Sequence, residues 1–324
     1  MRKEDLRIVY MGTPDFAVEP LKALVEGGYN VVGVITMPDK HSGRGMKLQY
    51  SPVKQYALEA SIPLLQPEKL KNPEFIEELR SLQADLQIVV AFRMLPEVVW
   101  NMPKLGTFNL HASLLPQYRG AAPINWAIIN GDKESGITTF FLTHEIDTGD
   151  VIQQERVAIS TEDTAGDLHD TLMTLGSKLV VETVDNIIEG NLTPIPQDKL
   201  IAQDPNELRA APKIFKETCR IDWNKPVESV YNHVRGLSPY PAAWSEIQFP
   251  SGDTQMIKIY QSTIERVEVT EPVGTLITDG KRVLKVALAD GYLHLDSVQL
   301  AGKKRVPAGD FIRGFRFEEG LCLK

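Results

Sequence analysis

LRIVYMG, residues 6–12, is an apolar run except for Arg7 and ends in glycine. It is followed by PDFAVEPLKALVEGG, residues 14–28, in which apolar residues recur at helical spacing before a closing pair of glycines. NVVGVIT, residues 30–36, is a second apolar run and is rich in β-branched residues. A strand that is apolar at every position is buried on both faces, as in a parallel sheet covered by helices. The stretch therefore predicts a strand, a helix and a second strand of an α/β domain.

The same alternation continues along the first two-thirds of the chain. Apolar strand candidates recur at residues 85–92 and 107–113, with helical candidates between them. Two further strand candidates, at 136–143 and 149–159, precede a long amphipathic segment. Strands that alternate with helices favour a doubly covered sheet. We therefore predict a mostly parallel sheet within a domain of residues 1–190.

The pattern changes after residue 190. Residues 191–212 are polar, contain four prolines and show no clear periodicity, which is typical of a linker. Beyond them, a helical segment at 226–237 precedes short strand candidates that are separated by turns such as PSGD, DGK and DG. Short strands at this spacing favour a small all-β barrel, which we predict within residues 213–324.

The composition indicates a globular protein with two domains. The chain has 324 residues, more than one hydrophobic core usually organises, and its apolar and charged contents of 43% and 24% are ordinary. We find no signal-peptide-like apolar stretch near the start and no run of about 18 apolar residues, so we expect no membrane segment and a cytoplasmic location. The two cysteines, Cys219 and Cys322, predict no disulfide framework and lack the spacing of a zinc site.

The net charge of −8 argues at first against a nucleic-acid partner, but this charge is unevenly distributed along the chain. Residues 208–324 contain 17 basic and 14 acidic residues, a net charge of +3. Residues 1–207 contain 18 basic and 29 acidic residues, a net charge of −11. This asymmetry indicates either a division of labour between the two parts or chance variation in surface charge.

Asn109 and His111 lie two residues apart in one strand candidate, so their side chains would point to the same face near its end. Open parallel sheets bind ligands beyond the carboxyl ends of their strands, and Asp147 lies in the loop after the next strand candidate. An amide, an imidazole and a carboxylate can together stabilise an oxyanion and move protons. Each residue alone also fits a structural role, as a satisfied histidine, a turn cap or part of a DTG turn.

Other kinds of catalysis lack a sequence signal. No serine or cysteine occurs in the context of a nucleophile elbow, and no cluster of cysteine and histidine suggests a metal site. We therefore expect direct transfer between bound substrates, without a covalent intermediate and without a metal ion.

Two basic segments are candidates for phosphate contact. Residues 37–54 form a long polar segment, in which the glycine-flanked Arg44 and the nearby Lys47 suit phosphate groups. The triplet Lys303–Arg305 follows a strand candidate in the second domain. A solvated mobile loop and a solvated turn are the respective alternatives for these two segments.

Taken together, the motifs resemble those of the folate-dependent formyltransferase family. NLHASLLPQYRG, residues 109–120, and the downstream Asp147 in HEIDTGD are similar to the signature of that family. YMGTPDFA near the start, RIDWNKPVESVYNHVRGLSPYPAAW at 220–244 and LAGKKRVPAGDFIRG at 300–314 resemble the branch that formylates initiator tRNA. The resemblance extends from about residue 6 to residue 317.

The resemblance implies a Rossmann-like catalytic domain, an OB-like C-terminal barrel and a transferase that moves the formyl group of 10-formyltetrahydrofolate to the α-amine of methionyl initiator tRNA. It implies no metal, and we expect a monomer. The implied catalytic residues are Asn109, His111 and Asp147, and the implied folate-binding residues are Ser113, Leu114, Leu115 and Pro116. The implied tRNA-binding residues are Arg44 and Lys47 in the inserted loop and Lys303, Lys304 and Arg305 in the barrel.

One departure from the family pattern and two alternative functions stay open at this point. Residues 91–95 read AFRML where family members usually carry Ala-Tyr-Gly, which places Arg93 near the expected pterin pocket. The catalytic trio serves a shared half-reaction, so an amino-sugar nucleotide or another small amine, such as glycinamide ribonucleotide, is an alternative acceptor. A non-catalytic RNA-binding protein that kept the fold is the alternative outside enzymes, and the intact trio argues against it.

Overall fold

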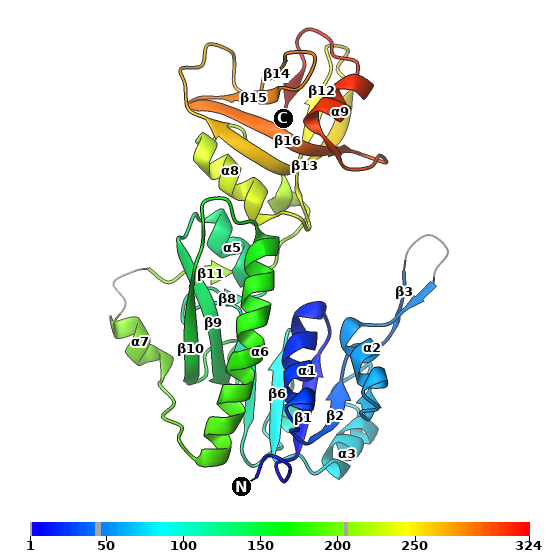
Figure 1. The fold of residues 1–324 in the computed structure, drawn as a ribbon, viewed down its shortest axis with the longest axis vertical. Helices are drawn as coiled ribbons and strands as arrows, with labels where there is room; N and C mark the ends of the chain where they lie inside the picture. The colour runs from blue at the N-terminus through cyan, green and yellow to red at the C-terminus, as the bar shows by residue number, and fades with distance from the viewer. Residues whose placement is uncertain (1, 43–46, 204–206) are drawn as a thin grey trace. The chain divides into compact units, whose positions relative to one another are not determined.

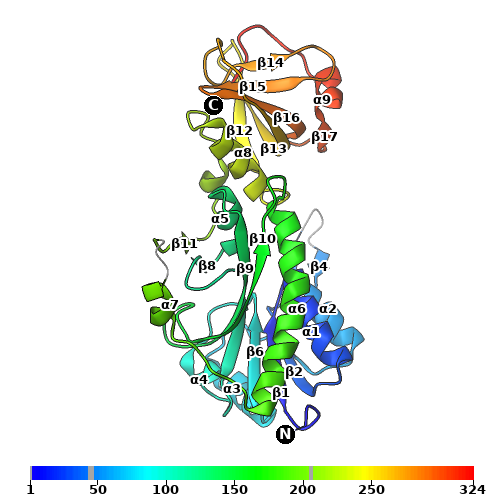
Figure 2. The same cartoon turned by 60° about the vertical axis from the view of Figure 1, so that its left-hand side comes forward.

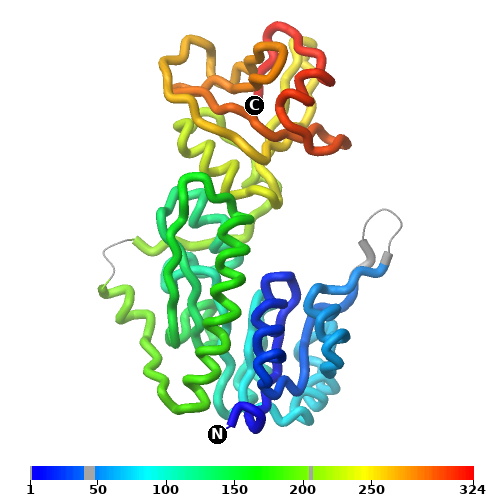
Figure 3. Tube along the Cα trace, viewed as in Figure 1, coloured from blue at the N-terminus to red at the C-terminus, as the bar shows by residue number. Residues whose placement is uncertain are grey.

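The computed structural model describes residues 2–42, 47–203 and 207–324, and the chain folds into two compact units (Figure 1). Unit 1 comprises residues 1–120, 135–157 and 169–210, and unit 2 comprises residues 121–134, 158–168 and 211–324. The trace in Figure 3 follows the chain from the N-terminal strands to the C-terminal strands. The domain boundaries expected from the sequence, at residues 190 and 213, stay a prediction.

A seven-stranded sheet forms the centre of unit 1, in the order β10-β9-β7-β6-β1-β2-β5. From β7 to β5 every neighbouring pair is parallel, whereas β9 runs antiparallel to β7. The mostly parallel sheet is therefore confirmed. The strands are β1 (Ile8–Gly12), β2 (Val31–Ile35), β5 (Leu64–Leu65), β6 (Leu86–Val90), β7 (Thr107–His111), β9 (Glu134–Phe141) and β10 (Val151–Ala158).

Helices cover both faces of this sheet, as Figure 2 shows with α1 and α6 on one side and α3 and α4 on the other. Strand β1 is buried along its whole length, and its alternate residues Val9 and Met11 belong to the same core cluster as Phe75 and Leu79 of α3. The apolar run that opens the chain is thus explained by burial on both faces. The helices are α1 (Val18–Glu26), α2 (Pro52–Glu59), α3 (Pro73–Ser81), α4 (Glu97–Trp100), α6 (Ala165–Glu189) and α7 (Gln197–Gln203), with the short η1 (Asp15–Ala17).

Two small two-stranded sheets complete this part of the fold. Strand β3 (Lys40–Ser42) pairs with β4 (Lys47–Gln49), and β8 (Arg119–Gly120) pairs with β11 (Ala210–Ala211). The segment expected to be a linker, residues 191–212, therefore contains α7 and β11. A helix of two turns shows too little periodicity to be found from the sequence.

An antiparallel barrel forms most of unit 2, in the order β14-β15-β16-β13-β12-β18, with β17 on β16. A bridge between Thr275 and Cys322 joins the region of β14 to β18 and nearly closes the barrel. Gly274 makes this approach possible, because a Cβ there would lie 2.7 Å from the Leu323 carbonyl oxygen. The strands are β12 (Ala243–Gln248), β13 (Thr254–Glu265), β14 (Leu276–Thr278), β15 (Leu284–Leu288), β16 (Gly291–Leu300), β17 (Val306–Pro307) and β18 (Cys322–Leu323). The predicted barrel is confirmed.

The helices of unit 2 pack against this barrel and against one another. They are α5 (Pro123–Ile129), α8 (Val227–Gly236) and α9 (Ala308–Gly314), with the short η2 (Glu217–Cys219). Asn125 of α5 donates from Nδ2 to the Gly236 carbonyl at the end of α8, at 2.8 Å. A Cβ at Gly236 would lie 2.9 Å from the Ile129 nitrogen, so glycine permits this close contact. Of the helices in the part of the chain that the structure describes, none is long and apolar enough to cross a lipid bilayer.

Candidate active site

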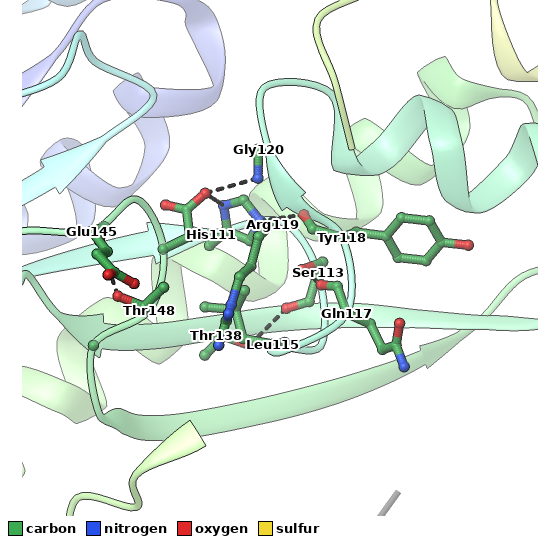
Figure 4. Close-up of polar contacts among 12 residues, drawn as sticks. His111, Ser113, Leu115, Gln117, Tyr118, Arg119, Gly120, Thr138, Glu145 and Thr148 are labelled. Atoms are coloured by element: carbon green, nitrogen blue, oxygen red, sulfur yellow. Dashed lines mark hydrogen bonds and ion pairs between the residues drawn. The ribbon is translucent and has the colours of Figure 1, made fainter. Parts of the chain in front are cut away.

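His111 is the last residue of β7 and lies at the carboxyl end of the parallel strands, buried beneath the segment that follows it. Its Nε2 lies 2.9 Å from the Tyr118 carbonyl oxygen (Figure 4). A carbonyl only accepts, so Nε2 carries the hydrogen and donates it. The other ring nitrogen, Nδ1, lies 3.8 Å from Oδ2 of Asp147. The Phe140 ring meets the imidazole edge-on, with centroids 6.4 Å apart. His111 therefore presents Nδ1 to a carboxylate.

Asp147 reaches the end of β7 from the loop between β9 and β10. Its Oδ2 accepts from the Gly120 backbone N–H at 2.9 Å, and its side chain is only 11% exposed. The Asp147 backbone has a φ of 55°, in the left-handed region that aspartate tolerates better than most residues. Two residues on, a Cβ at Gly149 would lie 1.7 Å from the Phe141 carbonyl oxygen, so only glycine fits. The DTG sequence thus sets the path of the loop and the position of the carboxylate.

Asn109 lies two residues before His111 on β7, and alternation along a strand directs both side chains to one face. Its Oδ1 is buried and has no hydrogen-bond partner among the described residues. The side chain as a whole is only partly buried. Nδ2 is the donor end of this amide and the atom through which Asn109 can donate to a ligand. The structure therefore places all three expected catalytic residues around the end of β7.

The expected folate-binding segment, residues 113–116, is held in place by hydrogen bonds to residues outside it. Ser113 donates from Oγ to the Gln117 carbonyl at 2.7 Å, and Leu115 accepts at its carbonyl from Gln154 Nε2 at 2.7 Å. Ser113, Leu115 and Pro116 are buried, whereas Leu114 is half-buried. The segment is thus a fixed wall beside His111, and its contact with folate stays a prediction.

Arg93, the residue that departs from the family pattern, lies just beyond the end of β6. Its Nη1 donates to the Glu68 carbonyl at 2.8 Å, and its Nη2 donates to the Pro67 carbonyl. Burial lowers the pKa of Arg93. The guanidinium therefore joins β6 to the loop that follows β5.

The inserted basic loop is only partly described. Arg44 lies outside the described residues, and Lys47 is described only as the first backbone position of β4. Lys54, at the base of the loop, is buried and donates from Nζ to Oδ2 of Asp39 at 2.6 Å and to Oε1 of Gln66 at 2.9 Å. Lys54 therefore fixes the end of the loop in the structure.

The basic triplet of unit 2 lies in the turn between β16 and β17, and its three side chains are exposed. Arg305 donates from Nε to Ser297 Oγ at 2.8 Å and stacks over the Tyr260 ring at 4.5 Å. The backbone of Lys303 is held by two hydrogen bonds. Its N–H donates to the Leu300 carbonyl, and its carbonyl accepts from Gln299 Nε2. The two lysines project into solvent and Arg305 lies along the barrel surface.

Sequence reasoning missed the backbone groups of this site. The Gly120 N–H and the Tyr118 carbonyl orient Asp147 and His111. Every residue carries a backbone carbonyl and every residue except proline an N–H, so the residue type does not reveal these roles. Among the residues that the structure describes, no group of three or more His, Cys, Asp or Glu side chains is placed to hold a metal ion. The chemistry that the described side chains offer is hydrogen-bond donation and proton transfer.

Comparisons with known proteins agree with this architecture. The model of the formyl transferase family matches residues 6–184, and that of the formyl transferase C-terminal domain matches residues 213–316. A methionyl-tRNA formyltransferase of Bacteroides thetaiotaomicron is 66% identical over 323 residues, covering 100% of both chains. One from Bacteroides fragilis is 65% identical over 325 residues, covering 100% of this chain and 99% of its own. An N-formyltransferase structure from Helicobacter canadensis, in complex with folinic acid and dTDP-3-aminofucose, has a TM-score of 0.64 at 21% identity, covering 92% of this chain and 100% of that chain.

The parallel sheet, the nearly closed barrel and the two matching family models define a formyltransferase. Over its full length the chain is about two-thirds identical to the two Bacteroides methionyl-tRNA formyltransferases, which identifies the branch of the formyltransferases. The chain belongs to the methionyl-tRNA formyltransferase family. The resemblance found in the sequence motifs is thereby confirmed.

Proposed function

We propose that Asn109, His111 and Asp147 catalyse formyl transfer at the end of β7. The enzyme uses 10-formyltetrahydrofolate as the formyl donor and methionyl initiator tRNA as the acceptor. The observation that supports this site most strongly is the position of His111, whose ring lies between the Tyr118 carbonyl and the Asp147 carboxylate. A substrate that enters beyond β7 meets an amide donor and this imidazole–carboxylate pair together.

The reaction begins when the methionyl amine attacks the formyl carbon. A carbon–nitrogen bond forms, and the carbonyl electrons move onto oxygen to give a tetrahedral oxyanion. Asn109 donates from Nδ2 to this oxyanion, which is a strong form of stabilisation where water is excluded. Collapse of the intermediate breaks the bond between the formyl carbon and N10 of the donor, and tetrahydrofolate leaves.

The imidazole–carboxylate pair handles the proton. Because Nε2 of His111 is occupied by the Tyr118 carbonyl, Nδ1 is the nitrogen that gains a proton, and it faces Asp147. The pair takes one proton from the attacking amine and returns one to N10 as tetrahydrofolate departs, so protons balance over the cycle. The distance of 3.8 Å between Nδ1 and Oδ2 is one that substrate binding can shorten.

We assign the contacts with tRNA to two basic segments, the turn at residues 303–305 of the barrel and the inserted loop. Lys303 and Lys304 are exposed on a barrel, and small barrels of the OB type bind nucleic acids through basic surfaces. Arg305, the next residue in the sequence, is exposed and stacks on Tyr260. Arg44 and Lys47 would contact phosphate groups from the inserted loop. We expect the enzyme to act as a monomer in the cytoplasm, which sedimentation and fractionation would test.

A comparison of acceptors tests the proposed function. The enzyme is incubated with 10-formyltetrahydrofolate and, separately, with charged initiator tRNA, free methionine or an amino-sugar nucleotide. We expect formyl-methionine on the tRNA and no product with the two small amines. Product with either small amine and none with tRNA would contradict the assignment. The Helicobacter enzyme shares only the fold at 21% identity, so its sugar ligand gives no support to that outcome.

A further inference from the structure

Gln197 is a buried residue whose side-chain amide is fully hydrogen-bonded to groups around Asp147. It is the first residue of α7, and only 2% of it is exposed. Its Nε2 donates to the carbonyl oxygens of Asp147 at 2.9 Å and Gly149 at 2.8 Å. Its Oε1 accepts from Nε and Nη2 of Arg119 at 3.0 and 2.7 Å. A buried amide thus uses both donor hydrogens and its acceptor oxygen.

These bonds join the two chain segments that meet at the catalytic carboxylate. Asp147 supplies the carboxylate, and Gly120, the residue after Arg119, donates its backbone N–H to Oδ2 at 2.9 Å. Gln197 therefore bonds the backbone on the Asp147 side of that hydrogen bond and the Arg119 side chain, next to Gly120, on the other side. Its effect reaches His111 through Asp147, because its side chain hydrogen-bonds Asp147, Gly149 and Arg119.

The loop that carries Asp147 needs such support. Asp147 has a φ of 55°, and Gly149 passes so close to Phe141 that a Cβ would not fit. A left-handed residue costs conformational energy and persists where its surroundings hold it. Gln197 bonds the carbonyls of both residues and so favours this path of the loop.

Gln197 is itself held in place from the preceding strand-like segment. Ile195 forms an antiparallel bridge with Val151, the first residue of β10, through hydrogen bonds of 2.9 and 2.8 Å. The chain turns into α7 two residues later. The amide is therefore carried by backbone that is paired with the strand following the Asp147 loop.

We propose that Gln197 is a positioning residue for formyl transfer, which fixes the Asp147 carboxylate relative to His111. This inference rests on the proposed role of Asp147. The segment that holds it, expected from sequence to be a linker, thereby contributes directly to the geometry of the active site. Misplacement of a reacting group by about 1 Å can cost about 100-fold in rate.

The first experiment measures kcat and KM of Gln197→Leu with charged initiator tRNA. We expect kcat to fall about 10- to 100-fold, with KM for either substrate changed less than about threefold. Gln203→Leu, at the exposed end of the same helix, is the matched control and should keep the wild-type kcat. A rise of KM with an unchanged kcat would overturn the proposal.

Two further variants separate the halves of the hydrogen-bond set. Gln197→Glu keeps an acceptor for Arg119 but loses the donor to the Asp147 and Gly149 carbonyls, so we expect a loss of kcat close to that of the leucine variant. Arg119→Met leaves the donor in place, so we expect a smaller loss. Wild-type kcat in Gln197→Glu would overturn the proposal.

A double-mutant cycle with Asp147→Asn distinguishes this inference from the proposed function. If Gln197 acts through Asp147, Gln197→Leu should add little to the loss caused by Asp147→Asn. Independent losses that multiply would overturn the positioning role and leave the catalytic role of Asp147 intact. Full activity of Asp147→Asn would instead overturn the proposed function, and with it this inference.

Discussion

Two oxygens orient the His111 ring, and they belong to segments far apart in the sequence. The Tyr118 carbonyl accepts from Nε2, and the Asp147 carboxylate lies opposite Nδ1. This arrangement fixes the tautomer and directs Nδ1 to the carboxylate. Asn109 differs from His111 because its amide does not ionise near neutral pH, which restricts it to hydrogen bonding. The three residues therefore have separable tasks.

Gly149→Ala tests the path of the Asp147 loop at the residue scale. A Cβ there would meet the Phe141 carbonyl oxygen at 1.7 Å, so the loop must move. We expect the variant to lose about 1–3 kcal/mol of unfolding free energy and to lose formyl transfer with it. Gly314→Ala, where a Cβ meets nothing within 4 Å, is the control for thermal denaturation and activity. Equal behaviour of the two variants would contradict the described loop geometry.

Helix α8 packs on the barrel and buries an ionisable side chain. Burial lowers the pKa of His233 from its usual value of 6.5, and its Nε2 has no partner among the described residues. Protonation would thus place an unsatisfied donor inside unit 2. The neutral form of His233 therefore fits this buried position better than the protonated form.

The pH dependence of stability follows from that lowered pKa. Between the folded pKa and the unfolded value of about 6.5, the unfolded chain binds more protons, so the unfolding free energy decreases as pH falls through this range. We expect the melting temperature to drop between pH 7.5 and pH 5.5, and to drop less in His233→Gln. Differential scanning calorimetry at both pH values measures this. Identical drops in the two proteins would exclude His233 as a cause.

Elements with a strong local pattern could be predicted, and those held by tertiary contacts could not. The apolar run of β1 predicts burial on both faces, and the spacing of Asn109 and His111 predicts a shared face of β7. Helix α7 could not be predicted, because it has only two turns and its one buried residue is a glutamine, Gln197. The Gln197 amide is hydrogen-bonded by backbone groups distant in the sequence, which no local pattern reveals. Gly120 marks a turn in the sequence, with a φ of 126° in the structure, but its role as backbone donor to Asp147 could not be inferred, because almost every residue carries an N–H.

At the scale of the whole molecule, charge is divided along the chain. Residues 208–324 have a net charge of +3, whereas residues 1–207 have a net charge of −11. Most of unit 2 belongs to the positive part. We expect a large anionic acceptor such as tRNA to bind basic residues there, because each phosphate contact releases condensed cations.

Lys303→Ala with Lys304→Ala tests the nucleic-acid surface of unit 2. Each phosphate contact contributes about 0.7–0.9 to the slope of log K against log salt concentration, so loss of both lysines should lower the slope by about 1.5. The donor KM should stay unchanged. Lys281→Ala with Arg282→Ala, an exposed basic pair on another turn, is the control. Equal slope changes for both pairs would indicate a diffuse charge effect and contradict a specific contact.

The most direct test of the catalytic site is the rate of single-turnover formyl transfer to charged initiator tRNA in Asn109→Ala and His111→Ala. Loss of one donor to an oxyanion, as in Asn109→Ala, typically slows turnover about 10²- to 10³-fold. Loss of a general acid–base group, as in His111→Ala, costs about 10²- to 10⁴-fold. We expect each variant to show a loss of this size while it still binds tRNA and folds as the wild type does. Single-turnover rates within a few-fold of wild type for both variants would contradict the assignment of catalysis to the end of β7.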